Sequence, residues 1–217
     1  MKKETFKKLI IPILSLALFV VLTILVQLVD VKPIGPYNSL VGFSKLNLFV
    51  HNLTGTNMLL YIITDWLGLV PIAFALGFAV LGLVQWKRRK HLKNVDYNLF
   101  VLGGFYIVVM AVYVLFEIIP INYRPVLING FLEVSYPSST TMLVMCVMPT
   151  LVMQLKTRIK NRMLERCLTF AIIVFTLFMV IARLISGVHW LTDIIGGAVL
   201  STSLVMMYYA VSNLKSK

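Results

Sequence analysis

Long apolar segments alternate with short polar ones along this sequence. The apolar segments run from Leu9 to Val29, Met58 to Trp86, Leu99 to Ile121, Thr141 to Leu155, Leu168 to Ile185 and Trp190 to Ser212. A membrane-spanning helix needs about 20 consecutive apolar residues, so each segment predicts one span. The fourth segment is short, and Ser138 and Ser139 extend it toward the required length. We therefore predict an all-α membrane protein, a bundle of six transmembrane helices.

The first 57 residues contain an anchor and an interfacial segment. The first apolar run resembles a signal peptide, but it exceeds the usual apolar region of about 7 to 15 residues and no cleavage pattern follows, so we predict a retained helix. Between Asp30 and Asn57, proline and glycine residues interrupt the chain around a stretch of mixed polarity, Leu40 to Leu53. This pattern predicts a loop with a helix lying at the membrane surface.

Composition agrees with a membrane protein. Hydrophobic residues make up 59% of the chain and charged residues 13%, whereas soluble domains are about 25% charged. The 217 residues are sufficient for one compact bundle, so residues 1–217 are interpreted as a single integral membrane domain. Cys146 and Cys167 lie inside apolar segments, which favours free thiols over a disulfide.

The distribution of Lys and Arg predicts the orientation. With the N-terminus in the cytoplasm, sixteen of the 20 basic residues lie on the cytoplasmic side: four before the first span, five at 87–93, five at 156–166, and Lys215 and Lys217. Cytoplasmic loops are enriched in basic residues, so both termini should be cytoplasmic. The net charge of +12 then reflects topology and contact with anionic membrane lipids, and it does not indicate nucleic-acid binding.

Polar residues suited to an anion gather on the opposite, extracytoplasmic side. Arg183 ends the fifth span, and His189 and Asp193 follow with a spacing of four, which puts imidazole and carboxylate on one face if the chain is helical there. Arg124 lies in the other large outer loop, and two guanidinium groups suit a tetrahedral anion. Residues 137–140, Pro-Ser-Ser-Thr, open the fourth helix, whose N-terminus also favours an anion. Together these residues predict a phosphate-sized site.

Each residue taken singly has a purely structural explanation. Arg183 fits a snorkelling residue, Asp193 a helix cap, and Tyr123 and Tyr136 are interpreted as interfacial anchors. The gathering on one side of the membrane is what favours the functional interpretation. We predict no metal and no cofactor, because the three histidines lie in separate parts of the chain.

The outer residues resemble the type-2 phosphatidic acid phosphatases, a family related to the vanadium haloperoxidases. That family carries Lys, six residues and Arg-Pro; then Pro-Ser-Gly-His; then Ser-Arg, five residues, His, three residues and Asp. The third motif is present here from Ala182 to Asp193, with only its serine changed, and the motif region spans 117–193. The resemblance implies that His189 is the phosphorylated nucleophile supported by Asp193. It also implies that Arg124, Arg183 and the segment Ser138, Ser139 and Thr140 bind the phosphate.

Two positions depart from the family pattern. Glu117 stands where the family has its phosphate-binding lysine, and Thr140 replaces the histidine that acts as general acid. Loss of a positioned acid costs about 10² to 10⁴ in rate, and least where the leaving group is itself a phosphate. This favours a lipid diphosphate, such as an isoprenoid (undecaprenyl-type) diphosphate, over phosphatidic acid. The alternative is a catalytically impaired member that binds or moves lipid phosphates; a vanadate enzyme is disfavoured because the lysine and histidine are absent.

Three acidic residues are candidates for a supporting role. Asp65 lies about eight residues inside the second span, where an ionisable group is expected to pair with an arginine. Glu133 lies in the loop that carries Arg124, and Glu117 occupies the lysine position. Each is either a replacement proton donor or part of a structural ion pair, for which Arg124 is the nearest expected partner of Glu117.

Overall fold

The computed structural model describes residues 2–213, with side chains from residue 9 onward, and this part of the chain is almost entirely helical. The helices are α1 (Lys2–Leu28), α2 (Ser44–Thr54), α3 (Met58–Leu67), α4 (Leu69–Arg89), α5 (Tyr97–Ile118), α6 (Ser139–Arg158), α7 (Arg162–Ile185) and α8 (Leu191–Ser212), with short 3-10 turns η1 (Pro36–Asn38) and η2 (Leu92–Asn94). Six segments of the described chain are long and apolar enough to cross a membrane. The predicted six-span helical bundle is therefore confirmed.

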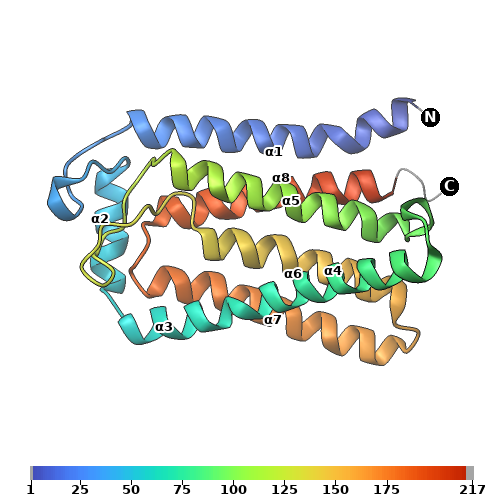
Figure 1. Ribbon diagram of the computed structural model, residues 1–217. Helices are drawn as coiled ribbons and strands as arrows, with labels where there is room; N and C mark the ends of the chain where they lie inside the picture. Colours follow the sequence, from blue (N-terminus) through green and yellow to red (C-terminus); the bar gives the residue numbers. More distant parts are fainter. Residues whose placement is uncertain (1, 214–217) are drawn as a thin grey trace.

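The spanning helices lie side by side, with the connecting segments gathered at two ends (Figure 1). One end, called here the α2 end, holds α2 and the connections 119–138 and 186–190; the other, the basic end, holds the connections 90–96 and 159–161. The start of α1 and the end of α8 both lie at the basic end, in agreement with the predicted pairing of the termini. That the basic end faces the cytoplasm stays a prediction from the charges, and Lys215 and Lys217, which support it, lie outside the described residues.

Helices α6 and α8 form the centre of the bundle. Half of the apolar window of each is buried, compared with 11% to 22% in the other four spans. Helix α8 packs on α1, α5 and α6, and Gly197 lets the start of α6 come close to it. Most large side chains of the other spans are exposed on the outside of the bundle, whereas Phe19, Leu102 and Met179 are among the few that point into it.

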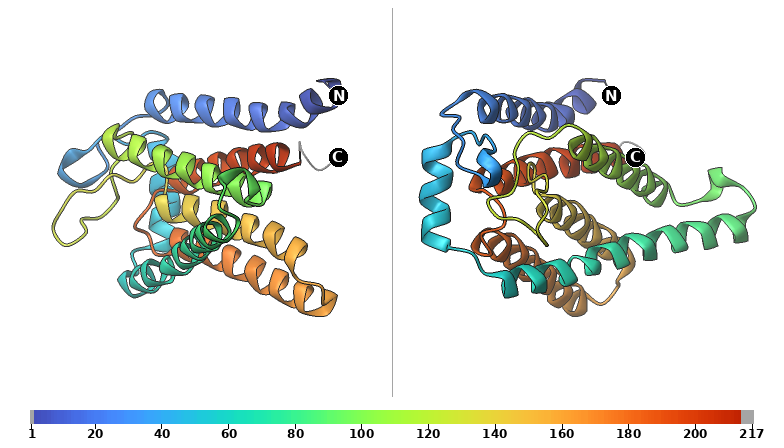
Figure 2. Two further views of the ribbon diagram at one scale, coloured as in Figure 1. Left: turned by 45° about the vertical axis from the view of Figure 1, so that its right-hand side comes forward. Right: turned by 60° about the vertical axis from the view of Figure 1, so that its left-hand side comes forward.

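The second span is two helices, not the single uninterrupted one that the apolar run suggested. Gly68 separates α3 from α4, and its amide donates to the carbonyl oxygens of both Thr64 and Asp65 at 3.0 Å. Before the break, α3 packs on α7; after it, α4 packs mainly on α6 and α5. Figure 2 shows α4 diverging from α7 toward the basic end.

Helix α2 confirms the helix predicted within Leu40 to Leu53, while its position at the membrane surface stays a prediction. It runs across the α2 end rather than along the spans (Figures 1 and 2). Its buried Asn47 joins it to α8: the side-chain amide donates to the Thr192 hydroxyl at 3.0 Å and accepts from the Thr192 amide at 3.2 Å. The helix therefore covers the beginning of α8.

Tyr136 is not the interfacial anchor suggested by the sequence. Its side chain is fully buried, stacks on Phe19 of α1 with ring centroids 6.3 Å apart, and shares a hydrogen bond of 2.9 Å with the Thr23 hydroxyl. On the other side its ring lies against Gly196 of α8, where an added methyl carbon would come within 2.6 Å. Tyr136 thereby fixes the segment that leads into α6 between α1 and α8.

Candidate functional site

His189 lies in the short connection between α7 and α8, not inside a helix as its spacing to Asp193 suggested. Helix α8 begins at Leu191 because the Trp190 amide donates to Asp193 Oδ2 at 2.9 Å and so caps the helix. His189 Nδ1 nevertheless lies 3.7 Å from Asp193 Oδ2, and both side chains are buried. The predicted imidazole and carboxylate pair is thus formed from the loop and the first helical turn, at a distance slightly longer than a hydrogen bond.

The connection that carries His189 needs a glycine. Gly187 has φ +66°, and a methyl carbon on it would come within 1.8 Å of the Gly55 carbonyl oxygen. The adjacent Ser186 carbonyl accepts from the Asn57 amide at 2.9 Å. The loop between α2 and α3 therefore packs directly on the backbone that presents His189.

Asp193 is held by three contacts from two connections of the chain. Its Oδ2 accepts from the Trp190 amide, and the Asn122 side-chain amide lies 3.4 Å from its Oδ1. Its own carbonyl oxygen accepts from the Ser138 amide at 3.0 Å. Since the carboxylate is fully buried, these contacts fix its direction toward His189.

Arg183 points into the bundle from the last turn of α7. Its side chain is 2% exposed, Nη1 donates to the Thr64 hydroxyl at 3.2 Å, and Nη2 lies 3.7 Å from Asp65 Oδ1. The expectation that Asp65 pairs with an arginine is confirmed. The Asp65 side chain is 60% exposed, so this carboxylate is reached from outside while the guanidinium is not.

Arg124 reaches the same place from the connection between α5 and α6. Its backbone amide donates to the Glu133 carbonyl at 3.0 Å, and its Nε lies 3.1 Å from Glu133 Oε2. The Tyr61 ring of α3 brings the two arginines together, because its centroid is 5.8 Å from the Arg124 guanidinium carbon and 4.8 Å from that of Arg183. Both guanidinium groups therefore share one aromatic ring.

Charge and burial keep His189 neutral. Burial lowers its pKa well below the ordinary value, and the positive charges of Arg124 and Arg183 lower it further. Nη1 of Arg124 and Nε of Arg183 are buried without a hydrogen-bond partner among the described residues. Buried donors normally have acceptors, so this cluster has the composition of a site for an oxyanion.

The beginning of α6 forms the third wall. Ser138 is fully buried and caps the helix by accepting from the Thr141 amide at 3.4 Å. Its carbonyl lies against Gly197 of α8, where an added methyl carbon would be only 3.0 Å away. Ser139 and Thr140 follow in the first turn and are half-buried. The predicted helix start is confirmed, whereas the phosphate contact of these residues stays a prediction.

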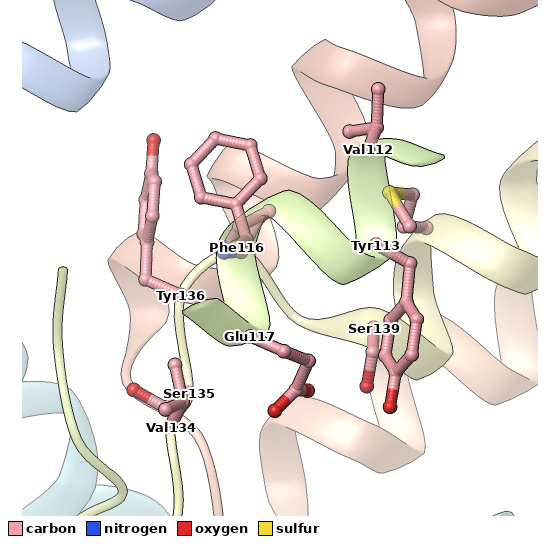
Figure 3. A pocket seen from close by; sticks show the side chains of 10 residues that line it. Val112, Tyr113, Phe116, Glu117, Val134, Ser135, Tyr136 and Ser139 are labelled. Atoms are coloured by element: carbon pink, nitrogen blue, oxygen red, sulfur yellow. The ribbon is translucent and has the colours of Figure 1, made fainter. Parts of the chain in front are cut away.

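Glu117 forms no ion pair with either arginine among the described residues. It is exposed near the end of α5, and Arg124 pairs with Glu133 instead. Glu117 lines a small hollow between α5 and the segment leading into α6, with a volume of about 10 Å³, close to the space one water molecule needs. Figure 3 shows its carboxylate and the hydroxyl groups of Tyr113 and Ser139 directed to the same side of this hollow.

Sequence reasoning missed three side chains that organise the site. Tyr61 belongs to an apolar span, Asn47 lies far from the motifs in sequence, and Asn122 occupies one of the unspecified positions of the first motif. The asparagines carried a weak signal, since a buried amide in an apolar context needs partners. Among residues 9–213, no group of three or more His, Cys, Asp or Glu side chains is arranged to hold a metal ion.

Comparisons with known proteins agree with the motif analysis. Residues 117–217, a little under half of the chain, match the model of the PAP2 superfamily, which confirms the family resemblance drawn from the motifs for that part of the chain. A solved structure, that of a transmembrane PAP2-type phosphatidylglycerolphosphate phosphatase from Bacillus subtilis, superposes with a TM-score of 0.61 over 92% of this chain and 94% of that one, at 17% sequence identity. The chain therefore has the fold of a PAP2-type membrane phosphatase. No curated protein sequence matches it.

Proposed function

We propose that this protein is a phosphatase that acts on a membrane lipid phosphate or diphosphate at the extracytoplasmic face. The observation that carries the proposal is the neutral, buried His189 beside the Asp193 carboxylate and within the field of two buried arginines. A neutral imidazole is the nucleophilic form of histidine. The PAP2 superfamily match and the phosphatase that shares the fold support the same reaction class.

The proposed reaction has two steps. Because Nδ1 of His189 faces Asp193, Nε2 is the nitrogen that attacks phosphorus, and the bond from phosphorus to the leaving oxygen breaks. The positive charge that develops on the imidazole is stabilised by the Asp193 carboxylate, and the phosphoryl oxygens bind Arg124 and Arg183. Water then attacks the phosphohistidine, which releases phosphate and restores the neutral ring. The 3.7 Å separation of His189 and Asp193 is expected to shorten when the charge forms.

Thr140 determines which substrate we favour. An alkoxide leaving group needs a proton, whereas phosphate, with a second pKa of about 6, leaves without one. Thr140 has no acidic proton to offer at neutral pH. We therefore propose an isoprenoid diphosphate, of the undecaprenyl type, as the preferred substrate.

A second candidate function is binding of lipid phosphates without hydrolysis. The ion pairs favour it, because Asp65 and Glu133 already partner the two arginines and would compete with a phosphate. Glu117 adds a further negative charge near the end of α5. Phosphate release from a lipid substrate distinguishes the two functions.

The experiment is phosphate release by the purified protein from matched isoprenoid diphosphate and monophosphate, and from phosphatidic acid. We expect the diphosphate to be hydrolysed about 10² to 10⁴ times faster than the monophosphate, which is the rate factor that a positioned general acid contributes. Thr140→His should raise monophosphate hydrolysis more than diphosphate hydrolysis, and His189→Ala should abolish both. Equal rates on both substrates would refute the leaving-group argument, and release that is unaffected by His189→Ala would refute the mechanism.

A further inference from the structure

An apolar groove lies on the side of the bundle, nearer the basic end than the anion site formed by Arg124, Arg183 and His189. It is bounded by α4, α6 and α7, encloses about 240 Å³, and is lined by carbon side chains that include Val70, Phe74, Leu151, Ala171 and Phe175. The groove exists because the break at Gly68 sends α4 toward α6 while α3 stays on α7. Figure 2 shows this divergence of α4 from α7.

The same helices that form the groove also carry the anion site. Helix α7 ends with Arg183, α6 begins after Ser138, and α4 continues the span whose α3 half carries Asp65. The groove residues of α7 run from Leu168 to Phe175, which is 15 to 8 residues before Arg183. At a rise of 1.5 Å per residue, the groove lies about 12 to 22 Å from the Arg183 level along the helix axis.

The distance between Arg183 and the groove determines how long a lipid chain must be to reach the groove. The hydrocarbon core is about 30 Å thick, so one leaflet extends about 15 Å from either surface. Arg183 lies two residues before the end of α7, and the groove therefore crosses the middle of the membrane. A lipid chain that extends about 15 Å, the depth of one leaflet, reaches only the part of the groove nearest Arg183. The space of about 240 Å³, roughly eight water volumes, suits part of one chain rather than two.

We propose that this groove holds the distal part of a long isoprenoid chain whose phosphate lies at Arg183, so that the protein selects substrates longer than one leaflet. The proposal rests on the function proposed above. Lipid tails are as apolar as the groove, so binding there gains from packing of carbon surfaces and not from removal from water. A moderate selectivity, of about tenfold, is expected.

Filling the groove should remove that selectivity. Ala171 is exposed on the groove side of α7, and Ala171→Phe places a ring in the groove; Ala111→Phe, at an exposed position of α5, is the matched control. We expect the unmodified protein to hydrolyse undecaprenyl diphosphate with a kcat/KM about tenfold above that for farnesyl diphosphate. Ala171→Phe should lower only the undecaprenyl value, and Ala111→Phe neither. Equal kcat/KM for both chains, or loss on both substrates with Ala171→Phe, would overturn the proposal.

A binding experiment separates the groove from the chemistry. Undecaprenyl phosphate with a photoreactive group near the end of its chain should label the peptides at 148–155 and 168–175, and Ala171→Phe should reduce this labelling. The corresponding alcohol without phosphate should label them several-fold less. Groove labelling without any phosphate release would support chain binding in the groove and refute the proposed phosphatase activity. Labelling elsewhere, or equal labelling by the alcohol, would refute the groove whatever the activity.

Discussion

The ion pair between Asp65 and Arg183 predicts that removal of one negative charge strengthens anion binding. Asp65 Oδ1 lies 3.7 Å from Arg183 Nη2, so an anion bound by that guanidinium lies close to a carboxylate. Asp65→Asn keeps the shape of the side chain and removes its charge. For unit charges about 6 Å apart the repulsion is about 3 kcal/mol at an effective dielectric constant of 20.

The exposure of Asp65 reduces this value. Its side chain is 60% exposed, so solvent screens the repulsion and we expect about 1 kcal/mol to be recovered, or a roughly fivefold lower Kd. Titration calorimetry with inorganic phosphate or orthovanadate at low salt measures it, and high salt should diminish the difference. Asp96→Asn is the control, since Asp96 pairs with Arg89 at 2.8 Å at the basic end. An unchanged or raised Kd in Asp65→Asn would show that the carboxylate positions Arg183 and does not compete with the anion.

His189 contributes a loss of stability in acid: its pKa is lowered in the folded state, so below about pH 6.5 the unfolded chain binds a proton at this residue that the folded one does not, and this group alone favours unfolding by roughly 1 kcal/mol per pH unit. His189→Gln removes this contribution, so as the pH falls below about 6.5 the Tm of the variant should rise relative to that of the unmodified protein. Gly196→Ala places a methyl carbon 2.6 Å from the Tyr136 ring and should lower the stability by about 1 to 3 kcal/mol, whereas Gly104→Ala, with open space around it, should not lower Tm. Gly130→Cys should react with an impermeant maleimide from the extracytoplasmic side only, and cytoplasmic labelling would contradict the proposed orientation.

The spans were predictable because they depend on a local property. A run of about 20 apolar residues has one stable arrangement in lipid, a helix across it. The interruption at Gly68 was not predictable in the same way, since Leu67 and Leu69 on either side are as apolar as the rest of the run. A single glycine is tolerated within many helices, and only the different packing partners of α3 and α4 distinguish a break there.

The candidate site was predictable only in part, because some of its residues are brought together by long-range packing that leaves no local pattern in the sequence. The motifs supplied Arg124, Arg183, His189 and Asp193. In the structure both arginines lie at the Tyr61 ring, His189 lies beside Asp193, and the charges of the two arginines act on His189. Tyr61, which lies under both guanidinium groups, has no motif and no polar neighbour in sequence to mark it. Its position follows from the packing of α3 on α7, which is a long-range contact.

The first turn of α8 explains how loops so far apart in sequence act together. Asn47 of α2 bonds Thr192, while Asn122 and Ser138, from the two ends of the connection 119–138, contact Asp193. Each bond satisfies a polar group that burial would otherwise penalise, so the loops are stable in this arrangement only while α8 is docked between them. His189 therefore lies directly before the helix that also orders the surrounding loops.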